Sequence, residues 1–258
     1  MSTAKDEAVC IRALKFSESS QIVTLFTRNH GKLPAIAKGS RRTAGRFAGG
    51  IGLLAAGAII FTPAKQAGQL ATLHEFVLTD GFEPLRKELL ALHCAQVAAQ
   101  LVASFVEEMD PHESLYDALV ESLTKWGTTN RPEWFLLEFE LRLLHEIGLA
   151  PLWDRCTLCE RSLETERVNG VEPDHLYFSS EKGGMLCATC EQTVMEKRFV
   201  QRNVLEILQN PQLGQTRQRR DVLDAHTLLS YHQRELLGNQ SSLTAFVNGL
   251  LEKEIASL

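Results

Sequence analysis

Four of the six cysteines fall into two short pairs whose spacing is typical of a metal site. Cys156 and Cys159 are separated by two residues, and so are Cys187 and Cys190. Two intervening residues allow both sulfurs of a turn to reach one ion at about 2.3 Å, and two such pairs complete the closed tetrahedral shell of structural zinc. The spacing therefore predicts a structural Zn²⁺ bound by Cys156, Cys159, Cys187 and Cys190.

The 27 residues between the two pairs exceed the usual spacing of about 15–20. They contain Tyr177-Phe178 and Lys182-Gly183-Gly184, which predict a small hairpin with a flexible turn. Redox-active or unmetallated thiols are the alternative to zinc. A redox pair opens a helix in a βαβ unit, and no such unit is evident here. The remaining cysteines, Cys10 and Cys94, are expected to pack as small apolar side chains.

We expect no enzymatic activity and no catalytic residues. Four thiolates leave no open position at a metal for an activated water. The sequence also contains no P-loop, no His-Glu-x-x-His and no Gly-x-Ser-x-Gly motif, so the common phosphate-binding and nucleophile signatures are missing. A metalloenzyme would need an open site with other ligands, for which we find no candidate.

A basic loop is the second group of residues with a clear chemical use. Four cations lie within nine positions among Gly, Ser and Thr residues between Lys38 and Arg46. Such a loop can follow a phosphate backbone. Two further cations flank the predicted Asn29–Gly31 turn and would extend the same track. The predicted DNA-binding residues are Arg28, Lys32, Lys38, Arg41, Arg42 and Arg46.

The charge distribution agrees with that loop. Residues 1–50 carry nine Lys and Arg against three acidic residues, a balance of +6, while the rest of the chain balances to −11. Phosphate attraction depends on charges within about 8–10 Å, so the acidic remainder does not cancel it. A merely solvated basic face is the alternative. Phe16 and Phe47 are candidates for base stacking, whereas Phe26 lies in a dense apolar strand that suits the core. With so few aromatics, backbone-dominated binding of single strands fits better than sequence readout.

The elements that must position these residues change type along the chain. Strand composition occurs at about 9–16, 22–27, 33–36, 53–61 and 70–78, and five short strands without an intervening helix predict a small barrel such as an OB-fold. Apolar residues then recur at helical spacing, which predicts helices over about 85–105, 111–126 and 132–147 and again beyond 204. The helix that begins at Pro132 is apolar nearly all round and is expected to be buried.

The sequence thus predicts an α+β protein with two domains. Residues 1–80 form the OB-fold barrel that binds nucleic acid, and residues 81–258 form a mainly α-helical domain with the four-cysteine zinc-binding segment at about 154–192. The 258 residues are 44% apolar and 23% charged, as in soluble globular proteins. No apolar run approaches the ~20 residues of a membrane span, and no signal peptide precedes the barrel. We expect a cytoplasmic protein without membrane contact.

Short motifs follow one another in a specific order over nearly the whole chain. They are Glu18-Ser19, residues 22–27, His30-Gly31-Lys32, residues 37–42, Arg46-Phe47, Phe139-Glu140-Leu141, residues 143–148 with Ile147-Gly148, Cys156-x-x-Cys159, and Gly183-Gly184-Met185-Leu186-Cys187-x-x-Cys190. Each motif is modest alone, and the ordered set resembles RecO, the bacterial recombination mediator family.

The resemblance implies an N-terminal OB-fold, a central helical domain and a zinc-bearing segment. It implies a role in recombinational repair of DNA damage by the RecFOR pathway, in a cytoplasmic, nucleoid-associated protein. The activities implied are binding of single- and double-stranded DNA, annealing of complementary strands, and, with RecR, loading of RecA onto strands coated by single-stranded-DNA-binding protein (SSB). The C-terminal tail of SSB is a further implied partner. Lys32, Lys38, Arg41, Arg42 and Arg46 match basic positions of the family. The alternative function is a zinc-stabilised adaptor that binds only proteins.

Overall fold

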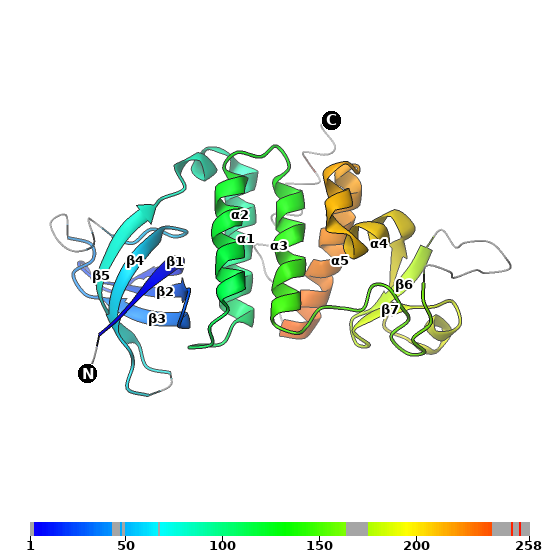
Figure 1. Cartoon of the computed structure of the whole chain (residues 1–258), viewed down its shortest axis with the longest axis horizontal. Coiled ribbons are helices and arrows are strands. Elements are labelled where there is room, and N and C mark those ends of the chain that lie inside the picture. The colour runs from blue at the N-terminus through cyan, green and yellow to red at the C-terminus, as the bar shows by residue number, and fades with distance from the viewer. Residues whose placement is uncertain are drawn as a thin grey trace. The chain divides into compact units, whose positions relative to one another are not determined.

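The computed structural model of the chain divides into two units, unit 1 (Met1–Asn130) and unit 2 (Arg131–Leu258). It describes residues 3–42, 47, 50–66, 68–163, 175–238, 249 and 253. Within the described residues, unit 1 contains a five-stranded barrel and the helices α1 and α2, and unit 2 contains the helices α3, α4 and α5 and a small sheet; Figure 1 labels most of these elements. The change from strands to helices after residue 80 lies inside unit 1.

Five strands form the closed barrel of unit 1. They are β1 (Ala4–Lys15), β2 (Gln21–Thr27), β3 (Gly31–Ala37), β4 (Ala56–Thr62) and β5 (Ala71–Asp80), in the spatial order β1-β2-β3-β5-β4. The β3–β5 pair is parallel and the other pairs are antiparallel, with β4 pairing back to β1. The predicted five-stranded barrel is therefore confirmed.

The barrel interior follows from the alternation of side chains along each strand. In β3, Leu33, Ala35 and Ala37 are buried while the residues between them are partly exposed, as expected for a strand with one face on the core. The barrel core also includes Cys10, which is fully buried as expected of a small apolar side chain. A register shift between Cys10 and Arg12 bends β1, so that this long strand can pair with both β2 and β4.

Gly31 lets the β2–β3 turn approach the segment before the second helix. Its φ is +66°, and a Cβ there would collide with the backbone carbonyl of Asp110. Lys32 forms a bridge with Glu108, and the Met109 N–H donates to the Lys32 carbonyl at 3.1 Å. An isolated bridge at Glu108 and a turn at Met109 with φ +61° precede the helix, which begins later than the sequence predicts.

The helical part of unit 1 consists of the 3₁₀ helix η1 (Glu83–Lys87), α1 (Leu89–Phe105) and α2 (Glu113–Trp126). Helix α2 begins at Glu113 with His112 at the cap position, two residues beyond the start predicted at Pro111. Cys94 is fully buried in α1, as expected.

Unit 2 begins with α3 (Pro132–Glu146), which is buried nearly all round as predicted. A three-stranded sheet follows in the order β7-β6-β8, formed by β6 (His175–Ser179), β7 (Gly184–Leu186) and β8 (Arg198–Gln201). The predicted hairpin is confirmed by the pairing of Tyr177 with Leu186 and Phe178 with Met185. Gly183 supplies the positive φ of +72° at its turn. The other described elements of unit 2 are η2 (Cys190–Thr193), α4 (Arg202–Gln209), η3 (Pro211–Gln215) and α5 (Arg219–Leu237).

A polar cluster is buried where α3 packs against α5. Glu140 and His226 both have fully buried side chains, and Glu140 Oε2 lies 2.6 Å from His226 Nδ1. Gln233 donates from Nε2 to Glu140 Oε1 at 3.3 Å. The opposite ring nitrogen of His226, Nε2, is buried and has no hydrogen-bond partner among the described residues. The cluster therefore joins the two helices through an ionisable pair and leaves one polar atom unsatisfied.

The α+β fold predicted from the sequence is confirmed: a five-stranded barrel, then a helical region that carries the clustered cysteines. Among the described helices, none combines the length and apolar composition that crossing a bilayer requires.

Candidate metal centre and nucleic-acid interface

The two cysteine pairs lie on turns that the β6–β7 hairpin brings together. Cys187 directly follows β7, so the second turn starts where the strand ends. The first turn is attached to the same hairpin, because the Thr157 N–H donates to the Met185 carbonyl at 2.9 Å. The Thr157 hydroxyl also donates to the Lys182 carbonyl at 2.8 Å. Pairs that are distant in sequence therefore become neighbours through one strand.

The geometry of the four sulfurs fits a tetrahedral metal ion. The Sγ atoms of Cys156, Cys159, Cys187 and Cys190 all lie within 4.8 Å of one another, and those of Cys159 and Cys187 are 3.7 Å apart. A tetrahedron with metal–sulfur bonds of ~2.3 Å has sulfur–sulfur edges of about 3.8 Å. The four cysteines are thus close together as the spacing predicts, and they can bind a metal ion.

Backbone amides and neighbouring sulfurs act on these thiols in opposite directions. Burial would raise the pKa of Cys156, but N–H groups of Cys187, Leu158 and Cys159 lower that pKa to about 7. Burial and the neighbouring sulfurs raise the pKa of Cys190 to about 12. A cation among four such sulfurs would favour the thiolate form of each. Amide donors already aimed at sulfur are the outer support that fixes metal ligands in place.

The basic loop follows β3 and is held against the β1–β2 turn. The Arg41 N–H donates to the Ser19 carbonyl at 3.1 Å, and the Arg41 side chain donates from Nη1 to the carbonyls of Ser17 and Glu18. Ser40 is buried and donates from its hydroxyl to Gln21 Oε1 at 3.0 Å. These bonds fix the chain at Ser40 and Arg41, while the side chains of Lys38 and Arg42 remain exposed.

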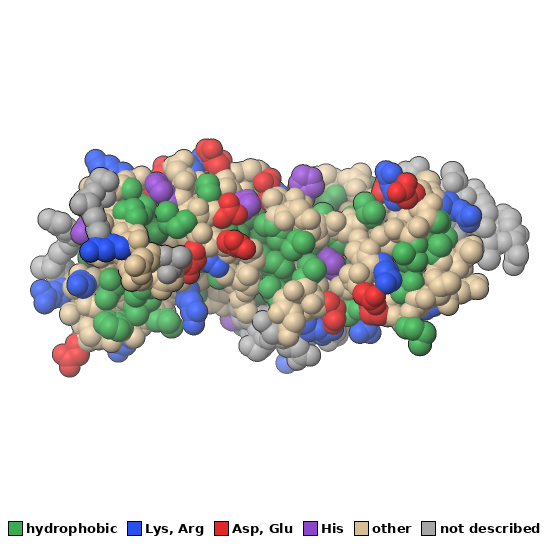
Figure 2. Space-filling model, turned by 90° about the horizontal axis from the view of Figure 1, so that it is seen from below, with side chains coloured by type: hydrophobic (Ala, Val, Ile, Leu, Met, Phe, Trp, Pro, Cys, Tyr) green, Lys and Arg blue, Asp and Glu red, His purple; other side chains and the backbone are tan. Residues whose placement is uncertain are grey.

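Three of the predicted cations come together in this loop. Lys38 and Arg42 are exposed, and Arg41 is half-buried. Among the described residues, no ion pair joins any of the three to a carboxylate. Arg46 lies outside the described residues. Figure 2 shows basic side chains spaced around the barrel end of unit 1, at the left of the picture, with apolar side chains between them.

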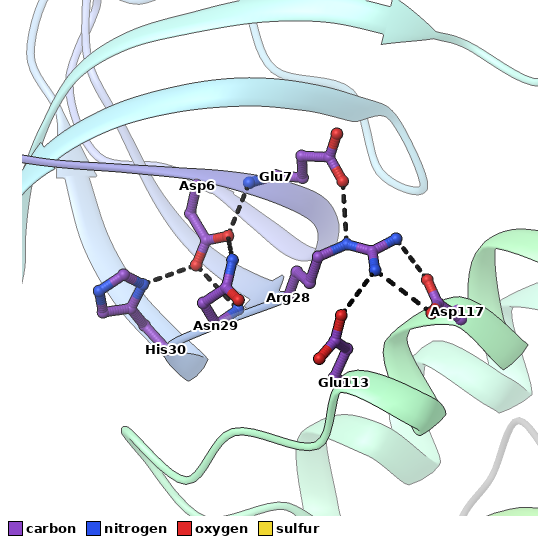
Figure 3. Close-up of polar contacts among 7 residues, drawn as sticks. All are labelled: Asp6, Glu7, Arg28, Asn29, His30, Glu113 and Asp117. Carbon is purple, nitrogen blue, oxygen red and sulfur yellow. Dashed lines mark hydrogen bonds and ion pairs between the residues drawn. The ribbon is translucent and has the colours of Figure 1, made fainter.

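Arg28 is not part of this group, because it lies at the other end of the β2–β3 hairpin. The seven-residue strands place the two ends about 20 Å apart. Its guanidinium is bound by three carboxylates (Figure 3): Nε and Nη1 lie 3.0 Å from Glu7 and Glu113, and Nη2 pairs with Asp117. No sequence signal identifies these partners, since two of them lie on α2, far along the chain.

The side chain of Lys32 is also hydrogen-bonded within unit 1. Its Nζ donates to the Ala103 carbonyl at 2.8 Å, and burial lowers the pKa of Lys32. Beside the same turn, the carboxylate of Asp6 accepts from the Asn29 backbone and side chain and lies 2.6 Å from His30 Nδ1 (Figure 3). Burial would raise the pKa of Asp6, but these donors lower it.

The candidate stacking residues occupy different environments. Phe26 is fully buried, as its apolar strand indicates, and Phe47 is 8% exposed and packs in the barrel core. Phe16 is 61% exposed, and its N–H donates to the Ser20 carbonyl in the turn that Arg41 contacts. Of the three, Phe16 therefore offers an open ring beside the basic loop.

Comparison with known proteins matches both halves of the chain to one family. The family model described as "Recombination protein O N terminal" matches residues 1–82, and "Recombination protein O C terminal" matches residues 86–240. The N-terminal family model is an OB-fold, in agreement with the five-stranded barrel.

Curated relatives named "DNA repair protein RecO" agree with this match. The chain is 30% identical to that of Caldanaerobacter subterraneus over 206 residues, which cover 79% of this chain and 78% of the relative. It is 29% identical to that of Syntrophus aciditrophicus over 259 residues, which cover 99% and 94%. The relative from Desulfatibacillum aliphaticivorans is 32% identical over 71% of this chain and 69% of its own length. The barrel, the helical region with its cysteine cluster, and these matches together place the chain in the RecO family.

Proposed function

We propose that the chain is a recombination mediator in DNA repair. In this proposal, the OB-fold region (1–80) binds single- and double-stranded DNA, and the region over 81–258 carries the zinc-stabilised segment. The protein anneals complementary strands and, together with RecR, helps to load RecA onto single strands coated by SSB, whose C-terminal tail it contacts. It speeds no covalent chemistry.

The observation that carries the proposal is the cation group of Lys38, Arg41 and Arg42. The Arg41 backbone is hydrogen-bonded to the β1–β2 turn and the Ser40 side chain to Gln21 of β2, and among the described residues the three cations have no carboxylate partner. Arg46, later in the same loop, belongs to the proposed DNA-binding set. Arg28 and Lys32 would have to leave their partners in unit 1 to contact DNA. We therefore assign them to barrel support.

Annealing follows from charge neutralisation. Two DNA strands repel each other through their phosphates, and a protein that neutralises phosphates with Lys and Arg releases the condensed counterions. A basic loop that contacts both strands lowers their repulsion at the place where base pairing must begin. The exposed ring of Phe16 offers a stacking partner for an unpaired base at the same place.

A salt titration of DNA affinity tests the loop. Each phosphate contact on single strands contributes about 0.7 to the slope of log affinity against log salt. If Arg41 and Arg42 each contact one phosphate, the Arg41→Ala/Arg42→Ala variant should flatten the slope by about 1.4 and bind roughly 25-fold more weakly at about 0.1 M salt. Arg155→Ala/Arg220→Ala removes the same charge from exposed positions of unit 2 and should leave the slope unchanged.

An unchanged slope in the Arg41→Ala/Arg42→Ala variant would contradict the assignment of the loop. A wild-type chain that binds RecR or the SSB tail but no DNA would favour the adaptor function. The mediator activity itself is measured by annealing of complementary strands coated with SSB and by RecA loading in the presence and absence of RecR. Both should proceed faster with the wild-type chain than with the loop variant.

We further propose that Zn²⁺ is the ion held by the four cysteines. Support comes from the donor set, because four thiolates with tetrahedral spacing favour zinc and leave no position for a water. A bound ion would cross-link the two turns and stabilise unit 2. Metal analysis of the purified chain should find about one zinc per chain, and Cys187→Ser should lose it. Metal retained by Cys187→Ser would place the ligands elsewhere.

A further inference from the structure

One face of the β6–β8 sheet carries aromatic side chains that the core does not use. Leu176, Phe178 and Val200 point into the core of unit 2, so strand alternation turns the residues between them outward. The outward residues are His175, Tyr177 and Phe199, which we call the outer aromatic face. His175 is exposed, Tyr177 is half-buried, and Phe199 is 55% exposed.

The three rings form one continuous surface. The rings of His175 and Phe199 are stacked, with centroids 4.6 Å apart and planes at 26°. The Tyr177 ring stands at 86° to both, with centroids 5.8 Å from His175 and 6.4 Å from Phe199. Exposed aromatic faces on a small sheet are the surfaces on which unpaired bases stack in nucleic-acid-binding proteins.

The charges around this face favour a polyanion. Residues 197–202 read Lys-Arg-Phe-Val-Gln-Arg, three cations and one aromatic without an acidic residue. Lys197 Nζ lies 5.1 Å from the centre of the Tyr177 ring. Among the described residues, two nearby acids have partners: Glu191 pairs with Lys197, and Glu196 accepts from Tyr231 and from Ser179. The repulsion of phosphates by Glu191 and Glu196 is therefore reduced.

We propose that the outer aromatic face stacks unpaired bases of single-stranded DNA. This inference rests on the proposed function and extends it from a phosphate-binding loop in unit 1 to a base-binding surface in unit 2. Duplex DNA keeps its bases stacked inside, so the face distinguishes single strands from duplexes. Because each base has a π face, binding here is tolerant of sequence. Since Lys197 is already paired, this surface adds little to the salt dependence.

The test removes the Phe199 ring from the protein and, separately, the bases from the DNA, and compares the effects on affinity. Fluorescence anisotropy is measured with three labelled probes: an oligothymidylate of about 30 nucleotides, an abasic oligomer of the same length, and a duplex. Phe199→Ala should bind oligothymidylate about five- to tenfold more weakly, the low end of the stacking range, with an unchanged salt slope. Its affinity for the abasic oligomer and the duplex should equal that of the wild type. Phe199→Tyr should retain binding, and so should Met195→Ala, which removes a 98% exposed apolar side chain without a ring.

Equal affinity of Phe199→Ala and wild type for oligothymidylate would overturn the inference. If the Arg41→Ala/Arg42→Ala variant then still shows its loss, the proposed function stands and only the outer aromatic face is refuted. A wild-type chain that binds none of the probes refutes both. A second measurement uses the wild-type chain alone, so that it does not depend on folding of a variant. Photo-cross-linking with 5-iododeoxyuridine oligomers should label residues 175–201, and labelling confined to unit 1 would overturn the inference.

Discussion

The buried Glu140–His226 pair allows a specific prediction about the unfolding free energy of the protein. Glu140→Leu removes the carboxylate that faces His226 Nδ1 at 2.6 Å and accepts from Gln233. Both side chains of the pair are fully buried, so water cannot replace the lost partner. Removing one member of a buried, hydrogen-bonded pair of ionisable side chains leaves the other without its partner and costs about 3–5 kcal/mol. We expect Glu140→Leu, and likewise His226→Leu, to lose stability in that range.

The double variant should behave differently. Glu140→Leu/His226→Leu removes both polar groups, and with them the unsatisfied Nε2 of His226. In the double variant the side-chain amide of Gln233 lacks its acceptor, which lowers stability by about 1–3 kcal/mol. The double variant should therefore be clearly more stable than the sum of the two single losses predicts, with a coupling energy of at least about 2 kcal/mol. Adding Gln233→Leu should recover further stability.

Urea unfolding followed by circular dichroism measures these free energies. The slope of unfolding free energy against urea should be the same for all variants, so that midpoint shifts report stability. Glu235→Leu, at an exposed position of α5, is the control and should change stability by less than about 0.5 kcal/mol. A loss below about 1 kcal/mol in Glu140→Leu, or additive losses in the double variant, would refute the reasoning.

Three further predictions concern the β2–β3 turn of unit 1. Because hydrogen bonds lower the pKa of Asp6, its contribution to stability is present above the unfolded pKa and lost as pH falls through the folded one. Asp6→Asn should therefore be less stable than wild type at neutral pH, and the difference in melting temperature should vanish well below about pH 4; a constant difference would contradict this. Arg28→Met leaves three carboxylates without their cation, so it should lose about 1 kcal/mol in a urea titration, with a smaller loss at about 0.5 M NaCl; no salt dependence would argue against the ion pairs. Gly31→Ala should lose more than about 2 kcal/mol, because positive φ and a backbone collision act together. Gly68→Ala, with φ +77° and open space, should lose only about 1 kcal/mol.

Local patterns were sufficient to predict the barrel and the cysteine cluster. Strand alternation and the Gly183 turn depend on neighbouring residues, so the sequence shows them directly. The two cysteine pairs are informative because ligand spacing within a turn is fixed by metal geometry. The sequence also predicts a hairpin between the two cysteine pairs, and in the structure Cys187 directly follows β7 of that hairpin.

Contacts between side chains from distant segments could not be predicted from the sequence. The sequence groups Arg28 with the basic loop because both are cationic, but the length of the β2–β3 hairpin separates them and α2 supplies the carboxylates that bind Arg28. Phe47 likewise sits in a basic loop and still packs in the barrel core. The segment 197–202 did carry a signal, an aromatic among cations, which becomes meaningful only when strand pairing places Tyr177 opposite Phe199.

The arrangement of strands limits how an extended segment of another molecule can attach by its backbone. In the barrel each strand has a neighbour on both sides over at least part of its length, and the paired amides and carbonyls are occupied there. The outer side of β7 is met by Leu152, whose N–H donates to Gly183 and whose carbonyl accepts from Met185. In the described sheet of unit 2, β8 is an edge strand, which is only four residues long and is preceded by a lysine. Short, charged edge strands resist strand addition, so the folded protein should tolerate high concentration without forming intermolecular sheets through β8.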